Sequence, residues 1–97
     1  MTQTERQKTY TNAYIRYGRD HQAAVAIEEL SECQKEICKF LRGYGNKEHL
    51  AEEVADAIIV LEQVTQFYGL QELISMYMDV KIKRLDETLR KESLQDG

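Results

Sequence analysis

Apolar residues recur with helical spacing in four stretches of this chain, and glycines separate the stretches. The 97 residues include no proline and only 5 glycines. Because proline interrupts helices most strongly, its absence favours long helices joined by short turns. The periodicity predicts helices over residues 4–17, 20–42, 47–68 and 70–92.

Glycines and capping residues mark the expected helix ends. Gly18 and Gly69 are expected to end the first and third helices. Asp20 and Asn46 are the expected N-caps of the second and third helices. The tail, residues 93–97, is expected to fray.

These helices predict a single all-α domain. Short connections favour antiparallel neighbours, so we expect a four-helix bundle-like fold around an antiparallel hairpin of the second and third helices. The expected apolar stripe of the second helix is Ala23, Ile27, Leu30, Ile37 and Leu41. The third helix is apolar almost all round at residues 57–61. A chain this short has a small core, so we expect a homodimer or homotetramer to complete it.

The net charge and the N-terminal segment limit the partners and the cellular location that we expect. The formal net charge is −4, which disfavours nucleic acid and anionic membranes as partners. An anionic ligand would need a bound cation or a few well-placed lysines. The polar N-terminus has no apolar signal segment, and no run is long enough to span a membrane. We therefore expect a cytoplasmic protein, with Cys33 and Cys38 as free thiols.

Carboxylates crowd the second and third helices. In the segment AIEELSECQKE, Glu28 and Glu32 are four residues apart, and in AEEVADAII Glu52 and Asp56 repeat that spacing. Each like-charged pair of this kind costs roughly 0.2–0.5 kcal/mol in an isolated helix. The face is either a solvated surface or a site where a cation offsets the repulsion.

The spacing of four acids favours a cation site. Glu29 and Glu32 lie one turn apart on the second helix, and Glu53 and Asp56 do so on the third. An antiparallel hairpin can bring the two pairs together, and four carboxylates form an all-oxygen site for Mg²⁺ or Mn²⁺. One difficulty is that Glu29 and Glu32 point nearly opposite the expected apolar stripe, so they must line a second surface.

The two acidic segments resemble a known family. EELSE, followed after a helical hairpin by EEVAD, resembles the EExxE…ExxD signature of the MazG-like all-α NTP pyrophosphohydrolases over about residues 20–90. The resemblance implies a homo-oligomer that uses Mg²⁺ to cleave a nucleoside triphosphate into a monophosphate and pyrophosphate. It maps the metal ligands to the two acid pairs named above. It leaves Glu28 and Glu32 as alternatives for the general base.

Basic and aromatic residues complete the candidate site. Lys81 lies within the apolar stripe of the fourth helix, with Arg84 at its edge, and both are candidate phosphate-binding residues. Lys81 has the alternative of packing its stem while its amine reaches water. Tyr17, His21 and Gln22, just before the acidic segment, are weaker candidates for binding the base or sugar.

Two alternative functions stay open at this point. A phosphoribosyl-ATP pyrophosphatase carries similar acidic helices and differs in the base and sugar pocket. A non-catalytic helical dimerisation or regulatory module would use the carboxylates as a solvated face or as a plain cation site. Saturable binding of Mg²⁺ would exclude the solvated face.

Overall fold

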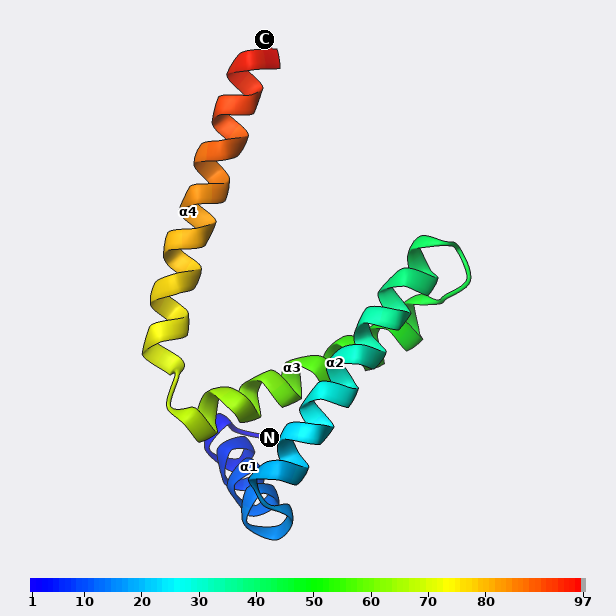
Figure 1. Cartoon of the computed structure of the whole chain (residues 1–97), viewed down its shortest axis with the longest axis vertical. Coiled ribbons are helices and arrows are strands. Elements are labelled where there is room, and N and C mark those ends of the chain that lie inside the picture. Colours follow the sequence, from blue (N-terminus) through cyan, green and yellow to red (C-terminus); the bar gives the residue numbers. More distant parts are fainter. Residues whose placement is uncertain (97) are drawn as a thin grey trace.

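The computed structural model describes residues 1–96, and that part of the chain folds into four α-helices without any strand. Figure 1 shows their arrangement. The helices are α1 (Gln3–Tyr17), α2 (Arg19–Leu41), α3 (Lys47–Tyr68) and α4 (Gln71–Asp96). The predicted all-α class is confirmed. No helix within residues 1–96 combines the length and apolarity that crossing a membrane requires.

Glycines end two helices as predicted. Gly18 has φ 86° and Gly69 has φ 63°, conformations that a residue with a Cβ rarely adopts. The Asn46 side chain accepts a hydrogen bond from the backbone N–H of His49 at 2.8 Å, which confirms it as the N-cap of α3.

Two details of the helix ends were predicted wrongly. Gly18, and not Asp20, is the N-cap of α2, because the glycine turn is so tight that α2 starts at the next residue. Asp20 lies in the first turn, where its charge still favours the helix dipole. Residues 93–96 continue α4, since nothing in Ser93–Asp96 interrupts a helix. Gly97 lies outside the described residues.

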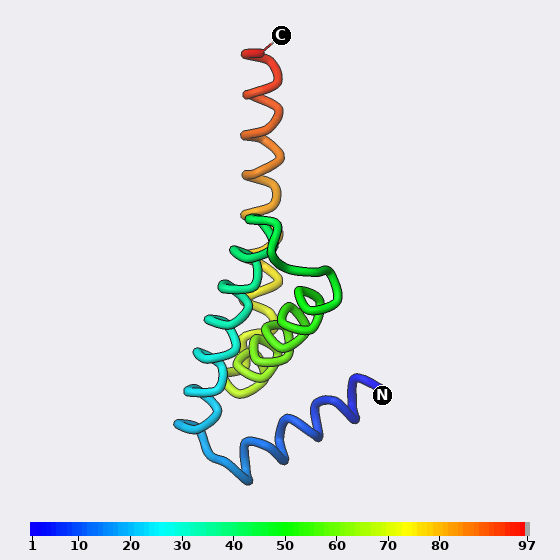
Figure 2. Tube along the Cα trace, turned by 90° about the vertical axis from the view of Figure 1, so that its right-hand side faces the viewer, coloured from blue at the N-terminus to red at the C-terminus, as the bar shows by residue number. Residues whose placement is uncertain are grey.

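Helices α2 and α3 form the antiparallel hairpin that was expected (Figures 1 and 2). Small residues make the contact: Ala26, Ala57 and Val60 are buried where the two helices meet. Small side chains let helix axes approach closely, so polar residues one turn away are also brought together.

The α2 residues that face α3 differ from the predicted stripe. The buried and half-buried positions of α2 are Gln22, Val25, Ala26, Glu29, Cys33 and Glu36, and all except Val25 follow the alternating three- and four-residue spacing of a helix seam. The predicted stripe points elsewhere: Ile27 is 71% exposed and Leu41 is 80% exposed. The physical reason is that small and acidic side chains, and not the largest apolar ones, occupy the seam.

Helix α1 packs against the C-terminal half of α3. The Tyr10 hydroxyl donates a hydrogen bond to Glu62 at 3.0 Å, and Arg6 forms an ion pair with the same carboxylate at 3.1 Å. The rings of Tyr14 and Phe67 lie 4.3 Å apart between their centroids. These contacts hold α1 across the open end of the hairpin.

Helix α4 extends away from the other three helices (Figures 1 and 2). None of its residues is buried. The accessible surface of the chain is 8097 Å², whereas a compact protein of this mass exposes about 5,700 Å². Its radius of gyration is 17.4 Å, against about 12.5 Å for a compact domain of this length. The predicted four-helix bundle-like packing is therefore wrong for a single chain, because α4 leaves the hairpin uncovered.

Candidate metal centre

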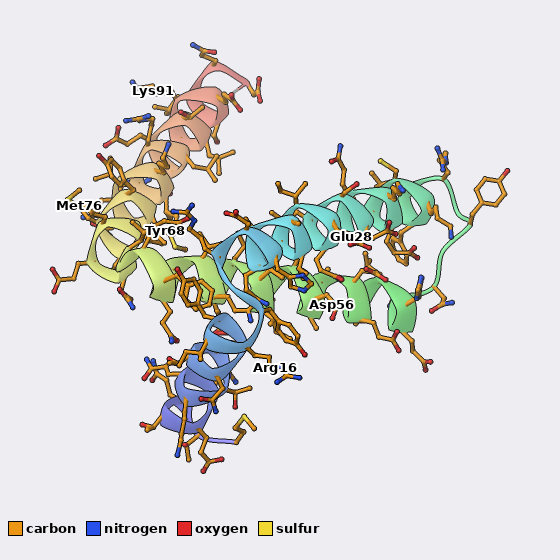
Figure 3. All side chains as sticks on the ribbon, turned by 60° about the horizontal axis from the view of Figure 1, so that its bottom comes forward. Arg16, Glu28, Asp56, Tyr68, Met76 and Lys91 are labelled. Carbon is orange, nitrogen blue, oxygen red and sulfur yellow. The ribbon has the colours of Figure 1, made fainter. Side chains whose placement is uncertain are left out.

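Three carboxylates from the two sides of the hairpin converge. One oxygen each of Glu29, Glu53 and Asp56 lies within 4.8 Å of the other two. Glu29 and Glu53 are partly buried and Asp56 is exposed. Figure 3 shows Glu28 and Asp56 on facing stretches of α2 and α3. Three of the four metal ligands expected from the sequence are thus neighbours in the structure.

The positions of these acids follow from the helix contact. Glu29 is one turn after the buried Ala26 on α2, and Asp56 directly precedes the buried Ala57 on α3. The alanines let the helices approach, which brings Glu29 opposite Glu53. The acids therefore lie next to the buried residues of the helix contact, and this limits the freedom of their backbones.

The negative charges of these three acids are not offset by neighbouring positive charges in residues 1–96. Partial burial, and then the charges of Asp56 and Glu53, raise the pKa of Glu29 above its ordinary value. The charge of Glu28 adds to this effect. Within residues 1–96, no lysine, arginine or histidine forms an ion pair with any of the three converging acids.

The two glutamates expected as base candidates flank the three converging acids. Glu28 is close enough for its charge to act on Glu29. Glu32 lies outside the converging group, and its Oε1 is 3.5 Å from the Lys35 Nζ. Both are exposed, so either is accessible to solvent and to a ligand on the same face.

The hairpin has one acidic and one apolar face. In an antiparallel helix pair, residues directly after the contact positions share one side, and residues directly before them share the other. The first side carries Ile27, Leu30, Ile37, Val54, Ile58 and Leu61, all at least partly exposed. The second side carries Glu28, Glu32, Glu52 and Asp56. This arrangement explains why Glu29 and Glu32 point away from the expected apolar stripe. The acidic side of α2 lies along α3, and the apolar stripe is the exposed surface.

Lys81 and Arg84 are not brought to these acids within one chain. Asp56 is about 20 Å along α3 from Gly69, and Lys81 is about 18 Å along α4 on the other side of that corner, at 1.5 Å per residue. The two helices diverge from the corner (Figure 1). The first turns of α4 also lie beside Ile58 and Leu61, on the apolar face.

The residues expected to bind the base or sugar lie in two separate places. The rings of Tyr17 and His21 pair with each other at 5.0 Å between centroids, and both are exposed. Gln22 instead lines a cavity of about 60 Å³ where α1, α2 and α3 meet. Phe67 and Gln63, which also line the cavity, came from no sequence argument, since they are distant from Gln22 in the chain.

A further buried carboxylate was missed by the sequence analysis. The Glu36 side chain is only 5% exposed, with its Oε2 at 3.4 Å from the His49 Nε2 and 3.8 Å from the Lys39 Nζ. No residue in the described range 1–96 forms a hydrogen bond with its Oε1, which lies against Gly45, where an added Cβ would be 3.2 Å away. Glu36 is seven residues after Glu29 on the α2 seam, which is the signal that would have revealed it.

Comparisons with protein-family models, with curated proteins and with solved structures find no match to this chain. A function for the chain is therefore inferred from its own residues and from the arrangement of the hairpin.

Proposed function

We propose that the chain is a Mg²⁺-dependent nucleotide pyrophosphohydrolase that cleaves a (deoxy)nucleoside triphosphate to a monophosphate and pyrophosphate. The observation that carries the proposal is the convergence of Glu29, Glu53 and Asp56 at the motif positions of EELSE and EEVAD. An all-oxygen donor set of this kind suits Mg²⁺ or Mn²⁺ and disfavours zinc.

The residues would divide the chemistry in a simple way. Glu29, Glu53 and Asp56 would hold the metal, which when bound supplies charge neutralisation to the triphosphate. Glu28 or Glu32, on the same face, would accept a proton from the attacking water. The raised pKa of Glu29 supports this division, because partial burial and the repulsion from the neighbouring acids both disfavour its ionised form, and a cation would offset them.

A homo-oligomer is part of the proposal. One chain exposes roughly 2,400 Å² more than a compact protein of its mass, and a standard interface needs about 800 Å² from each partner. The apolar face of the hairpin and the unpartnered α4 provide that surface. We expect a dimer or tetramer, in which Lys81 and Arg84 of a second copy are the cations available to the phosphates.

The test is a panel of nucleotides incubated with Mg²⁺, with pyrophosphate and orthophosphate measured separately. The panel contains the common ribo- and deoxyribonucleoside triphosphates and phosphoribosyl-ATP. Release of pyrophosphate, lost in Asp56→Asn, is the expected result. Release of orthophosphate alone would mean that a different bond is cut. Cleavage of phosphoribosyl-ATP alone would favour that alternative enzyme.

A further inference from the structure

The turn end of the hairpin has a carboxylate where a helix contact usually has an apolar residue. In the described stretch 30–55, Glu36 is the one buried residue, and Cys33 and Leu50 on the same seam are half-buried. The buried apolar residues of the hairpin, which lie nearer its open end, are Ala26, Ala57 and Val60. Apolar packing therefore does little to fix how α2 and α3 align near the turn.

The buried carboxylate links the two helices. Glu36 Oε2 lies 3.4 Å from the Nε2 of His49 on α3 and 3.8 Å from the Nζ of Lys39 on its own helix. The turn covers the other oxygen, Oε1, through Gly45. Of these neighbours, His49 is the one that belongs to α3, so its contact with Glu36 joins the two sides of the hairpin.

One alignment of the helices produces both this contact and the convergence of the acids. Glu36 is seven residues after Glu29 on α2, and His49 is seven residues before Asp56 on α3. In an antiparallel pair, equal steps in opposite directions lead to residues that face each other, so both contacts belong to one register. They are two turns, or about 10 Å, apart along the hairpin. A movement of α3 that separated His49 from Glu36 would also displace Asp56 from Glu29.

Stability does not explain a carboxylate at this position. Burying a charge costs free energy, and Oε1 of Glu36 forms no hydrogen bond with any residue in the range 1–96. An apolar side chain of similar size would avoid this cost, and such replacements of buried ion pairs are often neutral or stabilising. The best-attested benefit of a buried polar group between helices is that it specifies one register.

We propose that the contact between Glu36 and His49 sets the register of α2 against α3, and that Glu36 is thereby a positioning residue for the three converging acids. The role of those acids as a metal centre rests on the proposed function, whereas the register rests on the helix contact alone. Oε2 makes the contact, so the close approach of Gly45 to Oε1 is not part of it.

Two variants of Glu36 separate positioning from stability. Glu36→Met removes the carboxylate at nearly constant volume, whereas Glu36→Gln keeps an oxygen that accepts a hydrogen bond from His49 Nε2. Both lose the same charge, so a difference between them does not measure charge. In EDTA, thermal unfolding followed by circular dichroism should give Glu36→Met a Tm equal to or above that of the parent protein.

Metal affinity should change in the opposite sense. Mn²⁺, which suits the same oxygen ligands as Mg²⁺, is titrated into the full chain and followed by electron paramagnetic resonance. Glu36→Met should bind it about tenfold more weakly, the low end of the loss that residues supporting metal ligands produce. Glu36→Gln should stay within about threefold of the parent protein, because a charge about 10 Å away is largely screened by salt.

A double-mutant cycle tests whether Glu36 acts through His49. His49→Leu removes the partner, and adding it to Glu36→Met should cause little further loss of Mn²⁺ affinity, because the contact is already broken. Glu48→Gln removes an exposed charge beside His49 and is the control. The register itself is measured in EDTA, from nuclear Overhauser effects between α2 and α3 around Glu29 and Asp56. These should weaken in Glu36→Met and persist in Glu36→Gln.

The outcomes separate this inference from the proposed function. Unchanged Overhauser effects and Mn²⁺ affinity in Glu36→Met would overturn the inference, and so would losses that add in the double variant. Equal losses in Glu36→Met and Glu36→Gln, with a lower Tm in both, would also overturn it, because Glu36 would then act on stability alone. If the parent protein binds no Mn²⁺, the proposed metal centre fails, and the Overhauser effects in EDTA decide the register by themselves.

Discussion

Asp56→Asn should have opposite effects on stability in the absence and presence of Mg²⁺. Oxygens of Asp56 and Glu53 lie within 4.8 Å of each other. Their repulsion is about 0.9 kcal/mol at the dielectric constant of water and about 3.5 kcal/mol at an effective value of 20. Asp56 is exposed, so the lower figure applies. Losing about 1 kcal/mol of repulsion should raise Tm by about 4–8 °C in a domain of this size.

Magnesium should make the parent protein more stable than Asp56→Asn. A ligand that binds only the folded state at 100 times its Kd stabilises it by about 2.7 kcal/mol. The parent protein should gain this stabilisation, and Asp56→Asn should gain much less because it has lost one of three ligands. The variant is then the more stable protein in EDTA and the less stable one in Mg²⁺, with hydrolysis almost abolished.

The assay is thermal unfolding by circular dichroism at one fixed protein concentration, in EDTA and in millimolar Mg²⁺. Sodium chloride at matched ionic strength controls for screening. Glu87→Gln, which removes an exposed charge on α4, controls for the change in net charge. Equal Mg²⁺ shifts in the parent protein and Asp56→Asn, with hydrolysis retained, would show that Asp56 does not bind the metal and would refute the reasoning.

Light scattering at micromolar concentration should give a mass of two or four times 11.3 kDa, and a mass near 11.3 kDa at all concentrations would contradict the oligomer. Lys81→Met should weaken substrate binding without lowering Tm, since methionine suits an apolar stripe; unchanged kcat and KM would return Lys81 to a packing role. Gly45→Ala should lower Tm, because its Cβ would lie 3.3 Å from the Phe40 backbone as well as 3.2 Å from Glu36 Oε1, while the Mg²⁺ shift should stay the same. In metal-free protein the raised pKa of Glu29 means that the folded state binds more protons than the unfolded state in this pH range. The free energy of unfolding should therefore fall as pH rises from the ordinary glutamate pKa of about 4.3 through the raised pKa of Glu29. Glu29→Gln should make this fall smaller.

The sequence predicts the helices and the hairpin well because both depend on local chemistry. Gly18, Gly69 and Asn46 act through their own backbones and side chains, so neighbouring residues suffice to recognise them. The acid pairs were also recognised locally, and the hairpin turn places Glu29 opposite Glu53 with little freedom.

Other features could not be predicted because they depend on non-local contacts. Large apolar residues were assumed to face the partner helix within the chain, yet Ala26 and Ala57 form that contact and Ile27 is exposed. No residue of α4 is buried against the other helices, so a pattern within its own sequence does not specify its direction. The cavity joins Tyr14, Gln22 and Phe67 from three helices, so no local pattern indicates it.

The acidic seam and the exposed apolar face have one physical explanation. Carboxylates that share a cation must be held close together, and this requires small residues such as Ala26 and Ala57 at the helix contact. A seam of small and charged residues buries little apolar surface, so it contributes little hydrophobic stabilisation. The large apolar residues are then available on the opposite face, with Ile58 at 53% and Leu61 at 50% exposure. A second copy of the chain on that face would supply the missing burial and leave the carboxylates open to substrate, which is why we expect the metal centre and the oligomer to depend on each other.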